Sequence, residues 1–184
     1  AGLSSIENTE TNSDQRDLAI INLVDFSGNR IPDVVSANSA GLRLVSTPAG
    51  GKALEVAIRS KSKFSGVLIQ PTEPWNWSEQ SDFSLAFDIA NKGDHSVHLF
   101  FKLADKHGQE QIRAASIPIG ANPQTYFMVL HGKEMEIESG LRSNPPARDI
   151  KGSNLIWMRG ANRVDLSQIA KIEIYTDTIL HDRE

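Results

Sequence analysis

The sequence predicts an all-β protein with the architecture of a jelly-roll-like β-sandwich of two antiparallel sheets. Three observations lead to this prediction. Short runs of residues alternate between apolar and polar side chains, which is typical of strands with one buried face. Turn-forming residues separate the runs at the spacing of roughly 8–12 residues expected for a sandwich. No long window repeats apolar residues at the helical period of about 3.6 residues.

The stretch from Pro74 to Asn91 organises the predicted fold. It begins with Trp75 and Trp77, which lie on either side of a polar residue. The strand that follows, over 83–90, alternates large apolar residues with small or polar ones. The large residues are Phe83, Leu85, Phe87 and Ile89. Such an alternation predicts a central strand with one buried face, and it places the two tryptophans at the mouth of the sandwich.

The other expected strands follow from the same alternation. In chain order, the predicted strands are 19–26, 41–46, 53–59, 64–70, 83–90, 97–103, 111–117, 125–130, 154–158 and 171–176. Proline-containing loops are expected over 31–40 and 118–123, and a single helical turn over 165–169 with Asp165 as its N-cap. We expect the first and last strands to lie near each other. The predicted sandwich is galactose-binding-domain-like.

The length of 184 residues suits one domain that can bury a core without disulfides. Residues 1–17 are polar and aperiodic, which predicts a flexible leader, so the sandwich domain is expected to span 18–184. The first residue is Ala1 and the last is Glu184, and we expect the chain to be a piece of a longer protein.

Composition narrows the range of partners. The formal net charge of -4 argues against nucleic acid and against an anionic membrane, because both favour a basic surface. The chain has no cysteine, so disulfides and thiolate metal sites are excluded. No apolar run approaches the ~18 residues needed to span a bilayer. A neutral or weakly polar ligand fits this composition best.

No motif in the sequence predicts an active site. The chain contains no nucleophile elbow, phosphate-binding loop, dinucleotide fingerprint or zinc-protease motif. A glycosidase needs two carboxylates that face each other across a cleft. The clustered carboxylates here, Glu134, Glu136 and Glu138, alternate in a polar segment and are better explained as a solvated face. We therefore expect a module without catalytic activity.

Sugar binding needs an aromatic plane and planar polar side chains, both of which the sequence offers. The candidate carbohydrate-binding residues are Trp75, Arg142, Asn144, Trp157 and Arg159. Each tryptophan could instead pack in the core. Trp157 lies in a short apolar run, and Trp75 lies two residues from Trp77, which is expected to be a core residue. Arg142 and Asn144 lie in a long loop with two prolines, which predicts a contact with a ligand or partner.

Tyr126 has a simpler interpretation, because it alternates with Met128 and Leu130 and is expected in the core. A structural calcium ion is a second expectation, since such sandwiches often bind one through oxygen ligands. The candidate ligands are Asp25, Asp88, Glu173 and Asp177. No other cofactor is expected.

Five segments together resemble a known domain family. They are Trp-Asn-Trp-Ser (75–78), Leu-Ala-Phe-Asp-Ile-Ala-Asn (85–91), Gly-Leu-Arg-Ser-Asn-Pro-Pro (140–146), Trp-Met-Arg-Gly (157–160) and Val-Asp-Leu-Ser-Gln-Ile (164–169). The chain is similar to the N-terminal carbohydrate-binding-module-like domain of the β-agarases of glycoside hydrolase family 50.

This resemblance implies a ligand of the agarose type, either the polysaccharide or its neoagaro-oligosaccharides. It also implies a secreted or periplasmic bacterial parent enzyme, whose catalytic (β/α)8 barrel would follow this domain. Two functions remain open. The domain either binds sugar independently, or it packs on the barrel and completes the barrel's cleft without binding sugar alone, with Arg142 and Asn144 as cleft residues.

Overall fold

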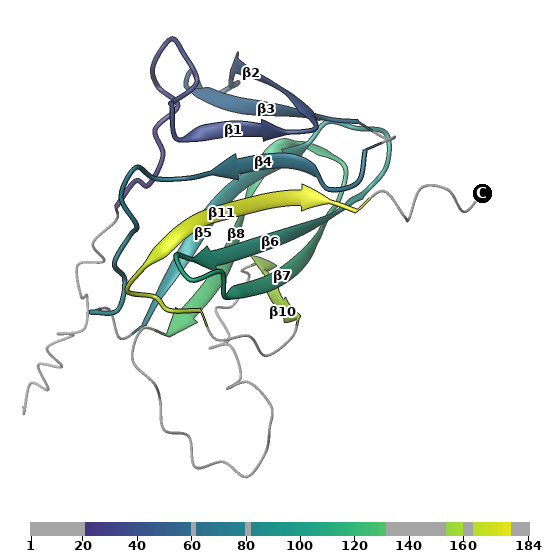
Figure 1. Ribbon diagram of the computed structural model, residues 1–184. Helices are drawn as coiled ribbons and strands as arrows, with labels where there is room; N and C mark the ends of the chain where they lie inside the picture. The colour runs from purple at the N-terminus through teal and green to yellow at the C-terminus, as the bar shows by residue number, and fades with distance from the viewer. Residues whose placement is uncertain (1–20, 60–61, 80–81, 132–153, 160–163, 178–184) are drawn as a thin grey trace, which may run out of the picture.

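Eleven strands and no helix make up the described part of the chain, which comprises residues 21–59, 62–79, 82–131, 154–159 and 164–177 of this computed structural model (Figure 1). The strands are β1 (Val35–Asn38), β2 (Ala40–Ser46), β3 (Lys52–Ile58), β4 (Ser65–Ile69), β5 (Asp82–Asn91), β6 (Val97–Asp105), β7 (Glu110–Ile117), β8 (Gly120–His131), β9 (Asn154–Leu155), β10 (Trp157–Arg159) and β11 (Ile169–Thr176).

Two sheets face each other, and a hairpin extends one end. The larger sheet has six strands in the order β1-β4-β11-β6-β7-β10, and the smaller has the order β5-β8-β9. In Figure 1, β5 and β8 lie behind the larger sheet, and the β2–β3 hairpin lies at the top. All pairings are antiparallel except the short parallel pair of β8 with β9. The all-β sandwich predicted from the sequence is confirmed.

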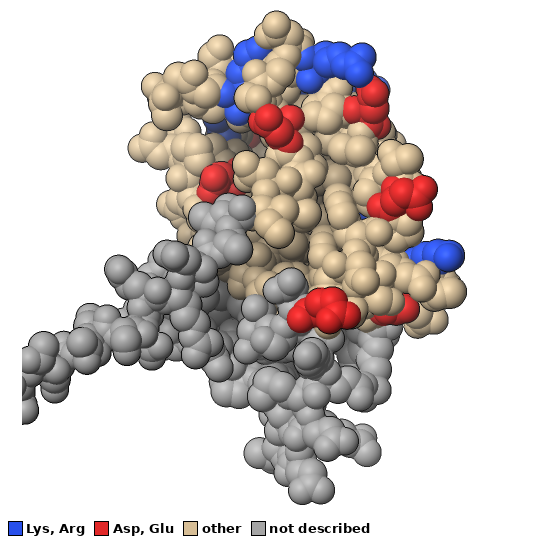
Figure 2. All heavy atoms as spheres, turned by 90° about the vertical axis from the view of Figure 1, so that its left-hand side faces the viewer, with Lys and Arg blue, Asp and Glu red and all other residues tan. Residues whose placement is uncertain are grey.

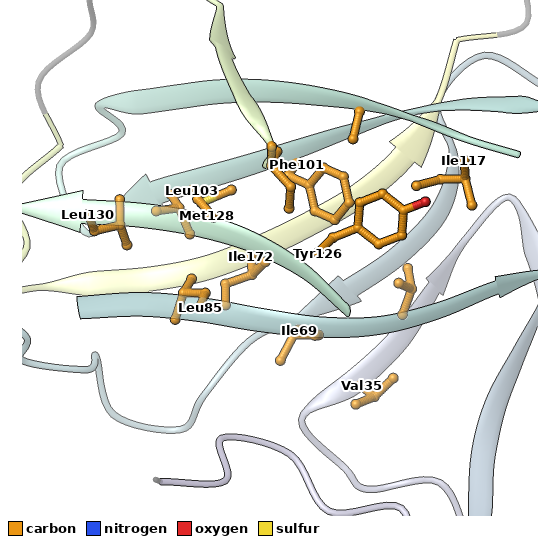
Figure 3. Packing of buried hydrophobic residues seen from close by; sticks show 13 residues of the cluster. Val35, Ile69, Leu85, Phe101, Leu103, Ile117, Tyr126, Met128, Leu130 and Ile172 are labelled. Atoms are coloured by element: carbon orange, nitrogen blue, oxygen red, sulfur yellow. The ribbon is translucent and has the colours of Figure 1, made fainter. Parts of the chain in front are cut away.

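The core lies between the inner faces of the two sheets (Figure 3). On β5, Leu85 is buried as predicted and pairs with Met128 of β8. On β6, Phe101 and Leu103 are fully buried and pack in the same cluster. Tyr126 is 4% exposed, which confirms its predicted place in the core. Burial of apolar surface contributes roughly 25 cal/mol per Å², so these side chains supply much of the driving force for folding.

The predictions for the first 40 residues were wrong in two places. Residues 21–26 form no strand, although a strand was expected over 19–26. The side chains of Leu23, Val24 and Phe26 pack irregularly against the core. The Asp25 side chain accepts hydrogen bonds from both the backbone and the hydroxyl of Ser27, which closes a turn. The expected loop over 31–40 contains β1, because Val35 is buried and pairs with Ile69. β1 lies at the sheet edge, so its exposed polar residues conceal the strand pattern.

Two further boundaries differ from the predictions. The expected helical turn over 165–169 is a polar turn that leads directly into β11. The Asp165 carboxylate accepts the N–H of Ser167, two residues on, and this local bond competes with helix formation. The expected loop over 118–123 is shorter, because β8 already begins at Gly120, which pairs with Asn91. The first and last strands are near neighbours, separated by β4.

Candidate functional site

The tryptophan end of the sandwich, defined by Trp75, Trp77 and Phe83, is an aromatic stack. The Trp75 and Trp77 rings lie 5.4 Å apart at an interplanar angle of 15°, and Trp77 meets Phe83 edge-on at 5.7 Å. All three side chains are partly buried and pack against the core. The stack therefore closes one end of the sandwich while it leaves part of each indole exposed.

Backbone hydrogen bonds hold the two tryptophans against the start of β11. Trp75 and Ile169 exchange two N–H···O bonds of 2.9 Å, and the Trp77 N–H donates to the Leu166 carbonyl at 2.7 Å. The Asn76 side chain between them accepts bonds from the backbone and the hydroxyl of Ser78. Because the chain is fixed on both sides of each indole, neither ring can move far without breaking these bonds.

A buried carboxylate organises the neighbouring turns. Asp105 is 4% exposed, and its Oδ1 accepts the N–H groups of His107 and Gln109 at 2.8 and 2.9 Å. Its Oδ2 accepts the N–H of Asp165 at 3.0 Å. Burial of Asp105 opposes ionisation, but the donated backbone N–H groups outweigh it and hold the pKa of this carboxyl below its usual value. The carboxylate thus ties the β6–β7 turn to the turn before β11.

The structure describes the other predicted site residues only in part. Phe83 pairs with Leu130, so β8 ends beside the tryptophan stack, and the segment 132–153 starts there. Arg142 and Asn144 belong to that segment and lie outside the described residues. The backbones of Trp157 and Arg159 belong to β10 and pair with Ala114 and Ile112. The structure describes neither of their side chains. Of the five predicted residues, only Trp75 has a described side chain, and their roles stay predictions.

The four predicted calcium ligands lie in three separate parts of the chain. Asp25 precedes β1, Asp88 lies on β5, and Glu173 and Asp177 are at β11 and its end. Asp88 accepts the Thr125 hydroxyl at 2.6 Å, while Glu173 pairs with a lysine of β6. Within the described residues, no three His, Asp or Glu side chains cluster as metal ligands. A structural calcium ion stays a prediction.

An aromatic cluster that the sequence did not reveal lies on the outer face of the larger sheet, toward the viewer in Figure 1. It consists of Phe64, His98, Phe100 and Tyr175. Tyr175 stacks on Phe100 with centroids 5.5 Å apart, and Phe64 meets Tyr175 edge-on at the same distance. Phe64 is 48% exposed and has a φ of 59°, a left-handed conformation that is uncommon for aromatic residues. We call this set the outer-face aromatic cluster.

Charge is unevenly distributed over the surface. Figure 2 shows basic side chains gathered at the top of the molecule, where the β2–β3 hairpin lies, and a middle region that is largely uncharged. The hairpin contains Arg43, which pairs with Glu55 on the neighbouring strand at 2.6 Å. No helix among the described residues is long and apolar enough to cross a membrane.

The geometry is that of a β-sandwich module with aromatic surfaces, and comparison with known proteins identifies the family. The family model described as the agarase CBM-like domain matches residues 25–184. The chain therefore belongs to the agarase carbohydrate-binding-module-like domain family. The resemblance noted in the sequence is confirmed.

Agarases of known sequence or structure are similar to this chain over part of their own length. Beta-agarase B of Vibrio sp. (strain JT0107) is 25% identical over 144 residues, which cover 73% of this chain and 15% of that protein. A solved exo-beta-agarase structure superposes with a TM-score of 0.73 at 34% identity, over 85% of this chain and 22% of that one. The crystal structure of an agarase, AgWH50C, gives a TM-score of 0.71 at 32% identity, with the same coverage. The chain thus spans about a fifth of the solved relatives' length.

Proposed function

We propose that this chain is a non-catalytic carbohydrate-binding module that recognises agarose or neoagaro-oligosaccharides as part of a secreted or periplasmic bacterial β-agarase. The observation that supports this most is the family match over residues 25–184, because the similar proteins are agarases. The partly exposed indole of Trp75, which stacks on Trp77, is the surface we assign to the sugar.

The chemistry of this surface suits a neutral galactan. The face of an indole packs against the C–H groups of a pyranose, and Trp75 offers such a face. Arg142, Asn144 and Arg159 would supply planar donors and acceptors for sugar hydroxyls. With little burial and no ion pair to the ligand, the expected dissociation constant is in the range of roughly micromolar to millimolar.

Replacing Arg142 tests this proposal. We expect Arg142→Ala to weaken binding of neoagarotetraose at least about tenfold in calorimetry, since a lost hydrogen bond from a charged donor is worth roughly 1.5–3 kcal/mol. The melting temperature should stay nearly unchanged. Arg30→Ala is the matched control, because Arg30 is an exposed arginine that pairs with Asp33, three residues away. Equal affinity for all three proteins would contradict the role of Arg142.

A second candidate function is docking on the catalytic (β/α)8 barrel of the parent agarase. Two observations favour it: the solved relatives have about four-fifths of their chain outside the matched region, and the outer-face aromatic cluster leaves Phe64 half exposed. An exposed aromatic surface on one sheet face is typical of an interface. The occupant we assign to this face is the barrel.

The docking function has its own test. Phe64→Ser should reduce capture of the separately produced remainder of the agarase while it leaves saccharide affinity unchanged. Ile21→Ser is the control, because Ile21 is also an exposed apolar residue, at 79%, but lies in the segment before β1. Equal capture by both variants would exclude the cluster as the docking surface.

A further inference from the structure

A small hollow opens at the end of the sandwich opposite the tryptophans. It lies where β5 ends, β7 turns into β8, and β8 begins. The residues that line it are Ile89, Asn91, Ile117, Pro118, Ile119, Gly120, Asn122, Gln124 and Tyr126. None of them carries a charge. We call this the amide hollow, and its lining predicts a neutral ligand.

The Tyr126 side chain contributes a hydroxyl-bearing ring to the lining of the amide hollow. Tyr126 is 4% exposed, and its ring belongs to the core. In Figure 3 its hydroxyl points toward Ile117, a second lining residue of the hollow. No hydrogen bond joins this hydroxyl to another described residue, so it is a donor and acceptor that a group entering the hollow could reach. Burial raises the pKa of Tyr126, so the hydroxyl remains protonated and can donate.

Some amide groups at the hollow are hydrogen-bonded within the protein, and others have no partner among the described residues. Asn91 is hydrogen-bonded within the protein: its Nδ2 donates to the carbonyls of His95 and Ile117, and its Oδ1 accepts the N–H of Gly93. Asn154 of β9 donates to the Gln124 side-chain oxygen at 3.3 Å.

The amide groups that remain are the Asn122 amide and the Gln124 amide nitrogen. No hydrogen bond joins either of them to another described residue. Both side chains are exposed and line the hollow together with Tyr126. Together they offer donors and acceptors at the mouth of the hollow that no described residue occupies.

The size of the hollow limits what can enter it. It has room for about one water-sized group, so a whole sugar ring cannot fit. One side of the rim is apolar, because Ile119 is 57% exposed and follows an exposed Pro118. A ligand that inserts one hydroxyl and rests its C–H surface on Ile119 would satisfy both features.

We propose that the amide hollow is a second saccharide-contact site, which takes a single hydroxyl of a neutral sugar between Tyr126, Asn122 and Gln124. This inference deepens the proposed function and rests on it for the class of ligand. A chain with contact sites at both ends could engage one polysaccharide strand at two points, which raises the effective affinity.

The test removes the Tyr126 hydroxyl and measures saccharide binding by nuclear magnetic resonance. We expect neoagarotetraose to shift the backbone amide resonances of Gly120, Asn122 and Gln124 in heteronuclear spectra of the labelled chain. Tyr126→Phe should weaken the affinity measured from these shifts about fivefold, the value of roughly one hydrogen bond. Tyr175→Phe is the matched control, because it removes a hydroxyl from the outer-face aromatic cluster instead. Asn122→Ala provides a second variant at an exposed position, should Tyr126→Phe fail to fold.

The outcomes separate this inference from the proposed function. Shifts confined to the tryptophan end, with unchanged affinity in Tyr126→Phe and Asn122→Ala, would overturn the second site and leave the proposed function standing. No shift anywhere in the wild-type spectrum would overturn both. Shifts at the hollow that Tyr126→Phe weakens and Tyr175→Phe does not would support the second site.

Discussion

The two ends of the sandwich satisfy their polar groups to different degrees. At the tryptophan end, the Asp105 carboxylate accepts three backbone N–H groups, and Trp75 exchanges two bonds with Ile169. At the amide hollow, the Tyr126 hydroxyl and the Asn122 amide have no partner among the described residues. The difference teaches that polar groups at the tryptophan end are used to hold turns together, whereas those at the amide hollow remain available to a ligand as far as the described residues show.

The largest expected effect is a loss of stability at the tryptophan end. Trp77→Ala should lower the free energy of unfolding by about 3–5 kcal/mol, as truncation of a core aromatic residue does. Urea unfolding followed by circular dichroism measures this change. Ile119→Ala at the other end is the control and should cost no more than about 0.5 kcal/mol, because Ile119 is largely exposed. A stable Trp77→Ala protein that no longer binds agarose would instead place Trp77 in the binding site.

An intermediate effect is expected from Asp105. Its pKa is lower in the folded chain, so its contribution to stability is present above the unfolded pKa of about 3.9 and is lost as the pH falls through the folded pKa. Unfolding of the wild type should therefore become easier below about pH 4. Asp105→Asn should cost about 1.5–3 kcal/mol at pH 7 and should flatten this acid dependence.

The exposed Asp25 is the control for that measurement, because its pKa is also lowered by hydrogen bonds from Ser27 but only within a local turn. Asp25→Asn should leave the acid dependence nearly unchanged. Equal slopes for wild type and Asp105→Asn would show that Asp105 does not tie the turns together.

The smallest expected effect on stability is at the amide hollow. Tyr126→Phe should change the free energy of unfolding by less than about 0.5 kcal/mol, because the removed hydroxyl has no described partner to lose. The same unfolding curves measure it. A loss of more than about 1.5 kcal/mol would mean that the hydroxyl is bonded inside the protein, and the contrast between the two ends would not hold.

Strand periodicity predicted most of the fold because each strand buries one face. The alternation at Leu85 and Tyr126 placed both residues correctly in the core. It failed over 21–26, because apolar side chains can pack on a core without strand pairing. It also missed β1, an edge strand with little apolar pattern.

The candidate surfaces were harder to predict than the strands. Asn91, Gln124 and Asn154 come from three separate segments, and only the register of β5, β8 and β9 brings them together. The outer-face aromatic cluster likewise joins residues from β6, β11 and the turn before β4. The sequence did identify Trp75 and the segment containing Arg142 as candidates, because neither was easily assigned to packing alone.

The most direct test of the account is depletion of the purified chain from solution by insoluble agarose, with cellulose as the control. We predict that agarose removes the folded chain and that cellulose does not. A well-folded chain that stays in solution with both polysaccharides would contradict autonomous sugar binding, and it would favour docking on the catalytic barrel through the outer-face aromatic cluster.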